Sequence, residues 1–507
     1  MENDSTYPNK QSASSSRVDL VSVFSREVGR IAFEKVRSNH GAPGCDGVTI
    51  DELEPIFDAQ WDGIVRSIRA GSYCPQPLRR VEIPKADGGV RKLGIPSVMD
   101  RVVQQALAQA LTPLFEPHFS PHSFAYRPGR STVDAVRSIQ DRLQSNDSLS
   151  TLHLDICAFF DSVDHALVRM CLARRPITGD VLELIDRSIR SSVLENGLVR
   201  TPTVGIPQGS PLSPLLANIV LDSFDQWLAR QGLAFARYAD DVLIVVQSLA
   251  AGQRIIEEAS HFLHSSLRLN LNREKTKLVH WSRASFLGFS FRQDLSGTIR
   301  RCVSTESLSA CRSEIARLTS PGDGPLDPGE NVGVFLSGWT AYYRLTEYST
   351  DLTQIYELAR DRVRERRWNA WRTVENRRRE LLNLGAAPKS VKGAVNQSAP
   401  PLELLREIMP DESFRRCRLT DPINRNRSES SSSNETGSPR PAYDGSIPRA
   451  TGRPQIHWRD SLIWALRRLT RSRLFRVRLE TSRSDGWFPR PSAIGVEIGP
   501  FCFRFRL

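Results

Sequence analysis

Residues 237–246 read RYADDVLIVV, and two adjacent aspartates, Asp240 and Asp241, stand between hydrophobic residues on both sides. The flanking residues predict two buried strands joined by a turn. Like charges held close repel, and burial makes each carboxylate more costly. Aspartate is common in turns, so an ordinary hairpin is one explanation. The other is that the pair holds divalent cations, because Mg²⁺ prefers oxygen ligands and shares them with substrate phosphates.

A third carboxylate follows another predicted strand. In LHLDICAFFD (152–161), Asp155 comes directly after three strand-like residues. Two Mg²⁺ ions about 3.5–4 Å apart clamp the attacking and leaving oxygens of an in-line phosphoryl displacement. Such a site needs a carboxylate from a neighbouring strand, and Asp155 can supply it. The residues alone thus leave two alternatives, a phosphoryl-transfer site and an ordinary hairpin turn.

The bulk composition indicates a soluble globular protein that is strongly basic. The 507 residues are 39% hydrophobic and hold 69 Lys+Arg against 57 Asp+Glu, a formal charge of +12. This charge favours a polyanionic partner such as nucleic acid, although a merely basic enzyme would fit it equally well. Eight cysteines without a CxxC pair predict no zinc ribbon and no disulfide framework. With no signal peptide and no membrane span, we expect a cytoplasmic protein.

Strands that alternate with helices and are joined by hairpins predict an α+β fold with helices on one face of a sheet. Residues 79–97 read as two strands around a turn at residues 87–89. Beyond about residue 300 the chain becomes helical and basic. Positions 360–379 carry nine arginines against three acidic residues, a net +6, and are expected to form one helix. Residues 425–452 are of low complexity and predict a flexible linker.

Nine segments in a fixed order give the chain a specific resemblance. They are PGCDG, IPKADGGVRKLGIPSVMDRVVQQAL, SFAYRPGRSTVDAV, LDICAFFDSVDH, GIPQGSPLSPLLANIVLDSFD, RYADDVLIV, LNREKTKL, FLGFSF and GWTAYYR. From about residue 20 to residue 410 the chain resembles the group II intron-encoded reverse transcriptase/maturases. The resemblance implies a right-hand polymerase fold and RNA-templated DNA synthesis from a primer 3′-hydroxyl. It also implies an RNA template, a DNA primer and dNTPs as partners, together with a structured group II intron RNA.

The resemblance also assigns residues by position. The catalytic metals, two Mg²⁺ ions with Mn²⁺ as an alternative, are expected on Asp155, Asp240 and Asp241, with help from the Ile156 carbonyl. The incoming dNTP is expected to contact Lys85, Arg91, Ala158, Phe159, Phe160 and Gln208. Template or primer contacts are expected at Arg127, Arg130 and Lys275. Binding of the intron RNA is expected at Arg366, Arg367, Arg377 and Arg378.

Several of these assignments have a structural alternative. Phe160 is fifth after Asp155, at the steric-gate position that excludes a 2′-hydroxyl, but it or Phe159 could be a core residue. Lys85 and Arg91 could belong to a solvated hairpin, and Lys275 to the end of a surface helix. The aromatic residues interleaved with the arginines of residues 332–384 could pack inside a helical bundle.

The resemblance implies five regions. These are a disordered N-terminus (1–17), fingers and palm (18–300), a helical thumb and maturase segment (301–424), the linker (425–452) and a basic C-terminal extension of open function (453–507). The paired cysteines and histidines of a nuclease domain are missing, as in the endonuclease-lacking, class C-like proteins. A domesticated or defence-associated reverse transcriptase and a non-catalytic RNA-binding maturase remain as alternatives.

Overall fold

The structure is a computed structural model. It describes residues 17–84, 89–144, 149–321, 327–397 and 400–411, residues 414 and 419, and strands at 475–481, 491–498 and 501–506. The expected disordered N-terminus, except residue 17, and the expected linker at 425–452 lie outside these residues. Among the helices of the described residues, none combines the length and the apolar composition that crossing a bilayer requires.

A four-stranded antiparallel sheet forms the centre of the palm. Its strands, in spatial order, are β6 (Ala234–Tyr238), β7 (Asp241–Val246), β3 (Ser150–Asp155) and β8 (Lys277–His280). Successive residues of a strand point to opposite faces, so an uninterrupted apolar run is expected where both faces are buried. In β7, Val242 and Ile244 enter one hydrophobic core, whereas Leu243 and Val245 enter a second core on the other face.

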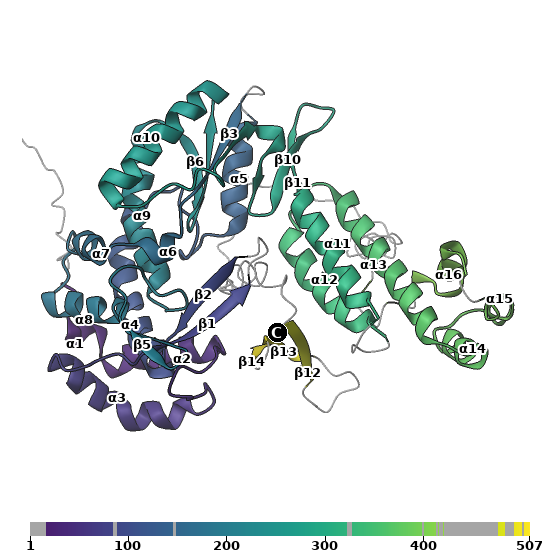
Figure 1. Cartoon of the computed structure of the whole chain (residues 1–507), viewed down its shortest axis with the longest axis horizontal. Coiled ribbons are helices and arrows are strands. Elements are labelled where there is room, and N and C mark those ends of the chain that lie inside the picture. Colours follow the sequence, from purple (N-terminus) through teal and green to yellow (C-terminus); the bar gives the residue numbers. More distant parts are fainter. Residues whose placement is uncertain are drawn as a thin grey trace, which may run out of the picture.

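Helices cover both faces of this sheet, which corrects the expectation of helices on one face. Helices α9 (Ser213–Arg230) and α10 (Leu249–Leu267) pack on the first face, and α5 (Thr132–Leu143) packs on the second (Figure 1). The sequence pattern was misleading because α5 precedes all four strands along the chain. A helix in that position gives no indication of which face it will cover.

The fingers consist of N-terminal helices and a small mixed sheet. Strands β1 (Leu78–Pro84) and β2 (Val90–Ile95) pair antiparallel, as the sequence predicts for residues 79–97. The other strands of this sheet are β4 (Val193–Glu195) and β5 (Leu198–Arg200). The helices of this part of the chain are α1 (Leu20–Val23), α2 (Arg26–Ser38), α3 (Leu53–Arg69), α4 (Val98–Phe115), η1 (Glu116–His118), α7 (His165–Leu172) and α8 (Gly179–Ile189), whereas the short α6 (Phe159–Ser162) directly follows β3 of the palm.

A second small sheet connects the palm to the thumb. It consists of β9 (Ser285–Phe286), β10 (Phe289–Gln293) and β11 (Ile299–Val303), preceded by η2 (Trp281–Arg283). The thumb begins with α11 (Thr305–Thr319), α12 (Gly329–Tyr343) and α13 (Ser349–Ala370). Leu243 of the palm, Phe289 of β10 and Leu336 of α12 belong to one continuous hydrophobic core. The second face of the palm sheet and the thumb therefore share their interior.

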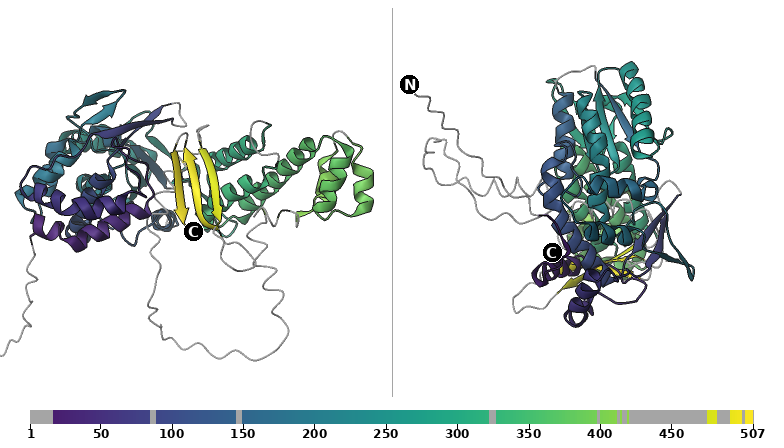
Figure 2. Two further views of the ribbon diagram at one scale, coloured as in Figure 1. Left: turned by 90° about the horizontal axis from the view of Figure 1, so that it is seen from below. Right: turned by 90° about the vertical axis from the view of Figure 1, so that its left-hand side faces the viewer.

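The basic stretch at 360–379 forms two helices, so the expectation of a single helix was wrong. Helix α13 ends at Ala370, and Thr373 caps α14 (Val374–Asn383) by accepting a hydrogen bond from the Asn376 amide at 3.2 Å. An N-cap threonine starts a new helix because its side chain satisfies an amide that lacks a partner within the helix. Helices α15 (Pro388–Ala394) and α16 (Leu402–Ile408) complete a separate small core with α14. Figure 2 shows this bundle at the opposite end of the molecule from α1–α3.

Near the C-terminus, β12 (Phe475–Thr481), β13 (Pro491–Ile498) and β14 (Phe501–Arg506) form an antiparallel sheet in that order. Two of the three strands, β12 and β14, coincide with segments in which apolar and charged residues largely alternate, FRVRLE (475–480) and FCFRFRL (501–507). The middle strand was not anticipated from the sequence.

Candidate active site

Two strand ends bring the predicted carboxylates together. The β6–β7 hairpin pairs Tyr238 with Asp241 and leaves Ala239 and Asp240 in the turn. On the other side of β7, Asp155 is the register partner of Asp241. Directly opposed residues of an antiparallel pair point to the same face, with Cβ atoms about 4.5–5.5 Å apart. The structure thus places Asp155 and Asp241 side by side and Asp240 next to them.

The ends of both segments have unusual backbone geometry. Ala239 has φ 61° and Ala158, three residues after Asp155, has φ 41°. Residues with a Cβ atom avoid this left-handed region, at a cost of roughly 1–2 kcal/mol each. The Asp155 carbonyl accepts a hydrogen bond from the Asn272 amide at 2.8 Å, and this bond holds the end of β3. Strain of this kind is often located at functional sites.

His153 contacts the site and was missed in the sequence. It lies two residues before Asp155, on the same face of β3, and its Nε2 atom is hydrogen-bonded to the Asp241 carboxylate. Burial lowers the pKa of His153, but the nearby charges of Asp241 and Asp155 and the hydrogen bond outweigh burial, so the pKa is raised above its usual value. Its position two residues before Asp155 places both side chains on one face of the strand, and this spacing was the signal in the sequence that could have identified His153.

The donor set has the right chemistry for a divalent cation, because carboxylate oxygens are the ligands that Mg²⁺ and Mn²⁺ prefer. Asp241, however, is turned towards His153. Among the described residues, no group of three or more acidic, histidine or cysteine side chains is gathered closely enough to enclose an ion. The three aspartates therefore fit a divalent cation by the chemistry of their oxygens, while the Asp241 carboxylate is held by His153.

The carboxylates lie in a large cleft between palm, fingers and thumb. Its volume is about 1760 Å³. Asp155, Asp240 and Asp241 line its floor, and the walls include Arg91 and Leu93 of β2, Glu306 and Arg317 of α11, and Phe335 and Trp339 of α12. The cleft is thus lined by acidic residues of the palm together with residues of β2, α11 and α12.

The two phenylalanines after Asp155 differ in their environment. Both line the cleft, but Phe159 is 1% exposed and belongs to the first core, whereas Phe160 is half-buried and packs against that core. Their rings meet edge to face at 5.3 Å. Phe160 is therefore the more exposed of the two rings.

The loop that carries Gln208 packs against this turn. Its Ile206 amide donates to the Phe160 carbonyl at 2.7 Å. Gly205 has φ 92°, and a Cβ atom there would be 3.0 Å from the Asp161 carbonyl oxygen, so only glycine fits without strain. On its other side, the Gln208 carbonyl accepts a hydrogen bond from the Gly94 amide of β2 at 2.9 Å. The loop thus ties the fingers to the palm, and Gln208 lines the cleft.

Comparison with known proteins identifies this arrangement. Residues 83–291 match the family described as reverse transcriptase (RNA-dependent DNA polymerase). Protein YkfC of Escherichia coli (strain K12) is 34% identical over 327 residues, which cover 56% of this chain and 85% of YkfC. This chain belongs to the reverse transcriptase family. The predicted enzyme class, an RNA-directed DNA polymerase with an α+β right-hand fold, is therefore confirmed.

Other relatives of this reverse transcriptase are intron-encoded or retron proteins. The group II intron-encoded protein LtrA of Lactococcus lactis subsp. cremoris is 27% identical over 337 residues, which cover 54% of this chain and 56% of LtrA. The retron Mx65 reverse transcriptase of Myxococcus xanthus is 31% identical over 208 residues, which cover 39% of this chain and 46% of that protein. The chain thus spans about half the length of both proteins, and the predicted resemblance to group II intron-encoded reverse transcriptases is confirmed.

The structure describes the remaining predicted nucleotide and primer contacts with the exception of Lys85. Arg91, Ala158 and Lys275 all line the cleft of the enzyme, with Arg91 half-buried and Lys275 exposed. Ile156 lines the cleft as well, next to Asp155. Lys85 lies outside the described residues, between β1 and β2 in the sequence.

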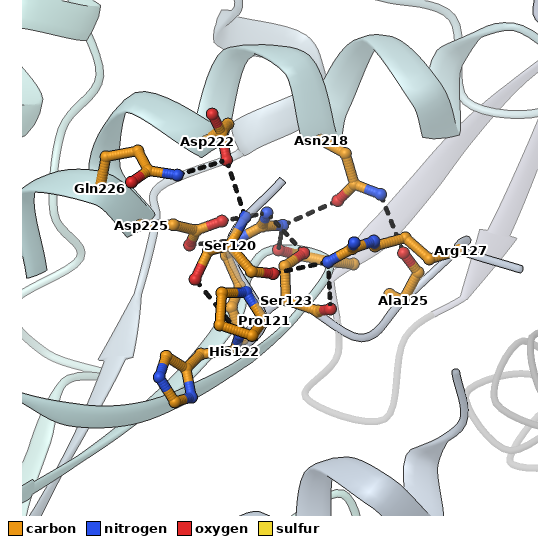
Figure 3. Close-up of polar contacts among 12 residues, drawn as sticks. Ser120, Pro121, His122, Ser123, Ala125, Arg127, Asn218, Asp222, Asp225 and Gln226 are labelled. Atoms are coloured by element: carbon orange, nitrogen blue, oxygen red, sulfur yellow. Dashed lines mark hydrogen bonds and ion pairs between the residues drawn. The ribbon is translucent and has the colours of Figure 1, made fainter. Parts of the chain in front are cut away.

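The predicted template contact at Arg127 is corrected by the structure. Its side chain is 3% exposed and forms an ion pair with Glu116 at 2.8 Å. Its Nη1 atom donates to the carbonyls of Ser120 and Ser123 at 2.6 and 2.8 Å (Figure 3). These contacts leave the guanidinium inside the protein, where it closes the loop before α5 and cannot reach a template.

Arg130 lies nearer to the surface of the same loop. Its Nη1 atom donates to the Pro121 carbonyl at 2.6 Å, and its guanidinium lies 5.5 Å from the centre of the Phe124 ring. Burial, together with the neighbouring Arg127 charge, lowers the pKa of Arg130. The structure thus ties Arg130 to its own loop and does not place it in the cleft with the carboxylates.

Two of the four predicted RNA-binding arginines have internal partners instead. Arg367 is 3% exposed and forms a two-pronged ion pair with Asp327 at 3.0 and 2.8 Å. Arg377 donates to the carbonyls of Trp371 and Gln397 at 2.9 and 2.8 Å and lies 4.5 Å from the centre of the Trp368 ring. Burial argues against an RNA contact at Arg367, whereas Arg377 is half-buried and its RNA contact stays a prediction. Arg366 is half-buried and Arg378 is exposed, so both remain open to a partner.

Proposed function

We propose that this reverse transcriptase extends a primer 3′-hydroxyl with dNTPs at Asp155, Asp240 and Asp241, using two Mg²⁺ ions, and that it binds a group II intron RNA. The observation that carries the site is the register pair Asp155 and Asp241, with Asp240 beside it, at the floor of the cleft. Bound ions would lower the pKa of the attacking hydroxyl and neutralise the leaving phosphates.

The residues around the carboxylates have separate tasks in this proposal. Arg91 enters the cleft from β2 and supplies positive charge for the triphosphate, which stabilises charge developing on the transferring phosphoryl group. Phe160 presents a flat ring under the sugar and leaves no room for a 2′-hydroxyl. Gln208 sits on a loop whose main chain is fixed to both fingers and palm, so it can meet the nucleotide in one geometry.

The intron RNA is the proposed partner of the helical segment. Exposed basic residues follow α13 and continue through α14 and α15: Arg372, Arg378, Arg379, Lys389 and Lys392. Lysine and arginine bind phosphates and release counterions, and this contribution does not depend on sequence. The names of relatives such as LtrA favour an intron RNA over another polyanion. A domesticated reverse transcriptase would keep the same palm without this partner.

The substitution Asp240→Asn tests the site. It removes one charge at constant shape, so extension of a DNA primer on an RNA template should be abolished. Affinity for the structured RNA should stay nearly unchanged, because the contacts with phosphates lie elsewhere. Both are measured on one preparation, with the unchanged protein as reference. Substantial extension by the variant would refute the assignment, and loss of extension together with RNA binding would indicate misfolding.

A further inference from the structure

A buried arginine lies immediately before the turn that carries Asp240. The Arg237 side chain is 0% exposed and forms an ion pair with Asp225 of α9, whose side chain is also 0% exposed. Arginine has five N–H donors, and each has an acceptor within reach here. Nε and Nη2 donate to the two Asp225 oxygens at 2.7 and 2.6 Å, Nη2 also to Ser123 Oγ at 2.8 Å, and Nη1 to Asn218 Oδ1 and the Ala239 carbonyl at 2.9 and 3.0 Å.

The bond to Ala239 acts on the catalytic turn directly. The Ala239 carbonyl belongs to the peptide that leads into Asp240, and Ala239 itself has the left-handed φ of 61°. L-residues adopt this conformation rarely, so something must hold it. The guanidinium of Arg237 holds one end of this peptide while Asp225 and Asn218 fix the guanidinium to α9.

The main chain of Arg237 is held as well. Its amide donates to the His122 carbonyl at 2.8 Å, and its carbonyl accepts from the Phe124 amide at 2.9 Å. The loop of residues 120–124 covers the free edge of β6. It is closed by Arg127 and by Asp222, which accepts a hydrogen bond from the Ser120 amide at 3.1 Å (Figure 3). The Arg237 side chain thus contacts the loop, helix α9 and the turn.

Stability alone does not account for such an arrangement. Removing a carboxylate and a guanidinium from water is costly, and apolar residues of similar size often replace a buried ion pair without loss. A fully satisfied polar network specifies one geometry instead. We propose that Arg237 is a positioning residue, which holds the Ala239–Asp240 peptide so that Asp240 and Asp241 face Asp155 across the sheet. This inference rests on the proposed function of the three aspartates.

The variant Arg237→Lys isolates geometry from charge. Lysine keeps the positive charge beside Asp225, but its single ammonium cannot span Asp225, Asn218 and Ala239 at once. A misplacement of reacting groups by about 1 Å can cost about 100-fold in rate, and we expect kcat to fall by about that factor. The KM for dNTP should change little, because the nucleotide contacts are intact. The Mg²⁺ concentration for half-maximal rate should rise several-fold.

Metal binding gives a second measurement that does not depend on turnover. Free and bound Mn²⁺ are distinguished by electron paramagnetic resonance, so binding is titrated with protein alone. Arg237→Lys should bind Mn²⁺ more weakly than the unchanged protein, whereas a purely structural role would leave the affinity of the folded molecules unchanged.

The matched control is Arg367→Lys. Arg367 is equally buried and forms a similar two-pronged ion pair with Asp327, but it lies in the thumb. Both variants should lower Tm, while only Arg237→Lys should change kcat on a short template and the Mg²⁺ requirement. If both variants lose extension in parallel with Tm, Arg237 is a structural residue and the proposal is overturned.

The outcome for Asp240→Asn separates this inference from the proposed function. If Asp240→Asn still extends primers, the site assignment fails and the positioning role fails with it. If Asp240→Asn is inactive and Arg237→Lys has normal kcat and Mg²⁺ dependence, only the positioning role is wrong. If Arg237→Lys fails to fold, Ser123→Ala is tested instead, because it removes one of the five hydrogen bonds of the Arg237 guanidinium. A raised Mg²⁺ requirement supports the proposal, and an unchanged one overturns it.

Discussion

In the palm, three aspartates lie at strand ends and face a cleft, whereas in the helical segment after residue 349 the aspartates lie among buried arginines. Asp361 pairs with Arg364 and Arg406 at 2.9 and 2.5 Å, and Arg364 also reaches Asp411 at 2.6 Å. The palm thus presents carboxylates to a cleft, while the buried Arg364 of the helical segment is neutralised by aspartates of that segment. Formal charge alone therefore says little about where a partner binds.

The largest expected effect is at the palm carboxylates. Asp155→Asn should reduce primer extension by about 10³-fold or more, because one member of a preorganised charged site is lost. Tm should not fall, since the substitution relieves repulsion between neighbouring carboxylates. Extension rates and thermal unfolding are the measurements. Asp161→Asn serves as the control, because Asp161 is an exposed acid of the same cleft that is not paired across the sheet. If both substitutions reduce primer extension equally, the rate depends on negative charge in the cleft in general and not on Asp155 specifically.

The buried ion pairs of the helical segment should affect stability instead. Arg364→Ala removes a side chain that is 3% exposed, together with its bonds to Asp361, Asp411 and the Met409 carbonyl, and should reduce the free energy of unfolding by about 3 kcal/mol. Denaturant unfolding measures this loss. Arg362→Ala breaks the exposed pair with Glu365 on the same helix and should cost no more than about 0.5 kcal/mol. Equal losses would contradict the contrast between buried and exposed arginines.

A smaller effect is expected at the cleft wall. Phe160→Ala removes the ring under the expected sugar and should reduce discrimination against ribonucleotides by about 10- to 100-fold. Competition between dNTP and rNTP in extension assays measures it. Phe159→Leu, a change within the core, should lower Tm while discrimination is kept. Unchanged discrimination in Phe160→Ala would locate the gate elsewhere.

The smallest effect concerns the exposed arginines. Replacing Arg372 and Arg378 together with alanine should weaken binding of the structured RNA and make its logarithmic salt dependence shallower by up to about 2. Extension on a short unstructured template should be almost unchanged. Arg254→Ala is the control, because Arg254 is 73% exposed on α10, away from this bundle. A loss of extension that matches the loss of RNA binding would place these arginines in the polymerase cleft.

The two regions also differ in what the sequence could predict. In the palm, period-2 patterning and motif order were sufficient to bring Asp155 next to Asp241, because strand register follows from the hydrophobic faces. His153 and Arg237 escaped notice since their roles depend on partners 88 and 12 residues away, in other strands and helices. In the helical segment, the composition gave the net charge but not the direction of each side chain. Arg367 is therefore internal although it belongs to a strongly basic stretch.

The continuous core beneath β7, β10 and α12 has a consequence for the product of the reaction. Two walls that share one interior cannot open or close independently, because widening the gap would pull apart packed side chains such as Phe289 and Leu336. The width of the gap between palm and thumb is then fixed when the chain folds. We therefore expect a cavity made deep in that core to lower copying accuracy, although none of the residues that line the cleft is changed.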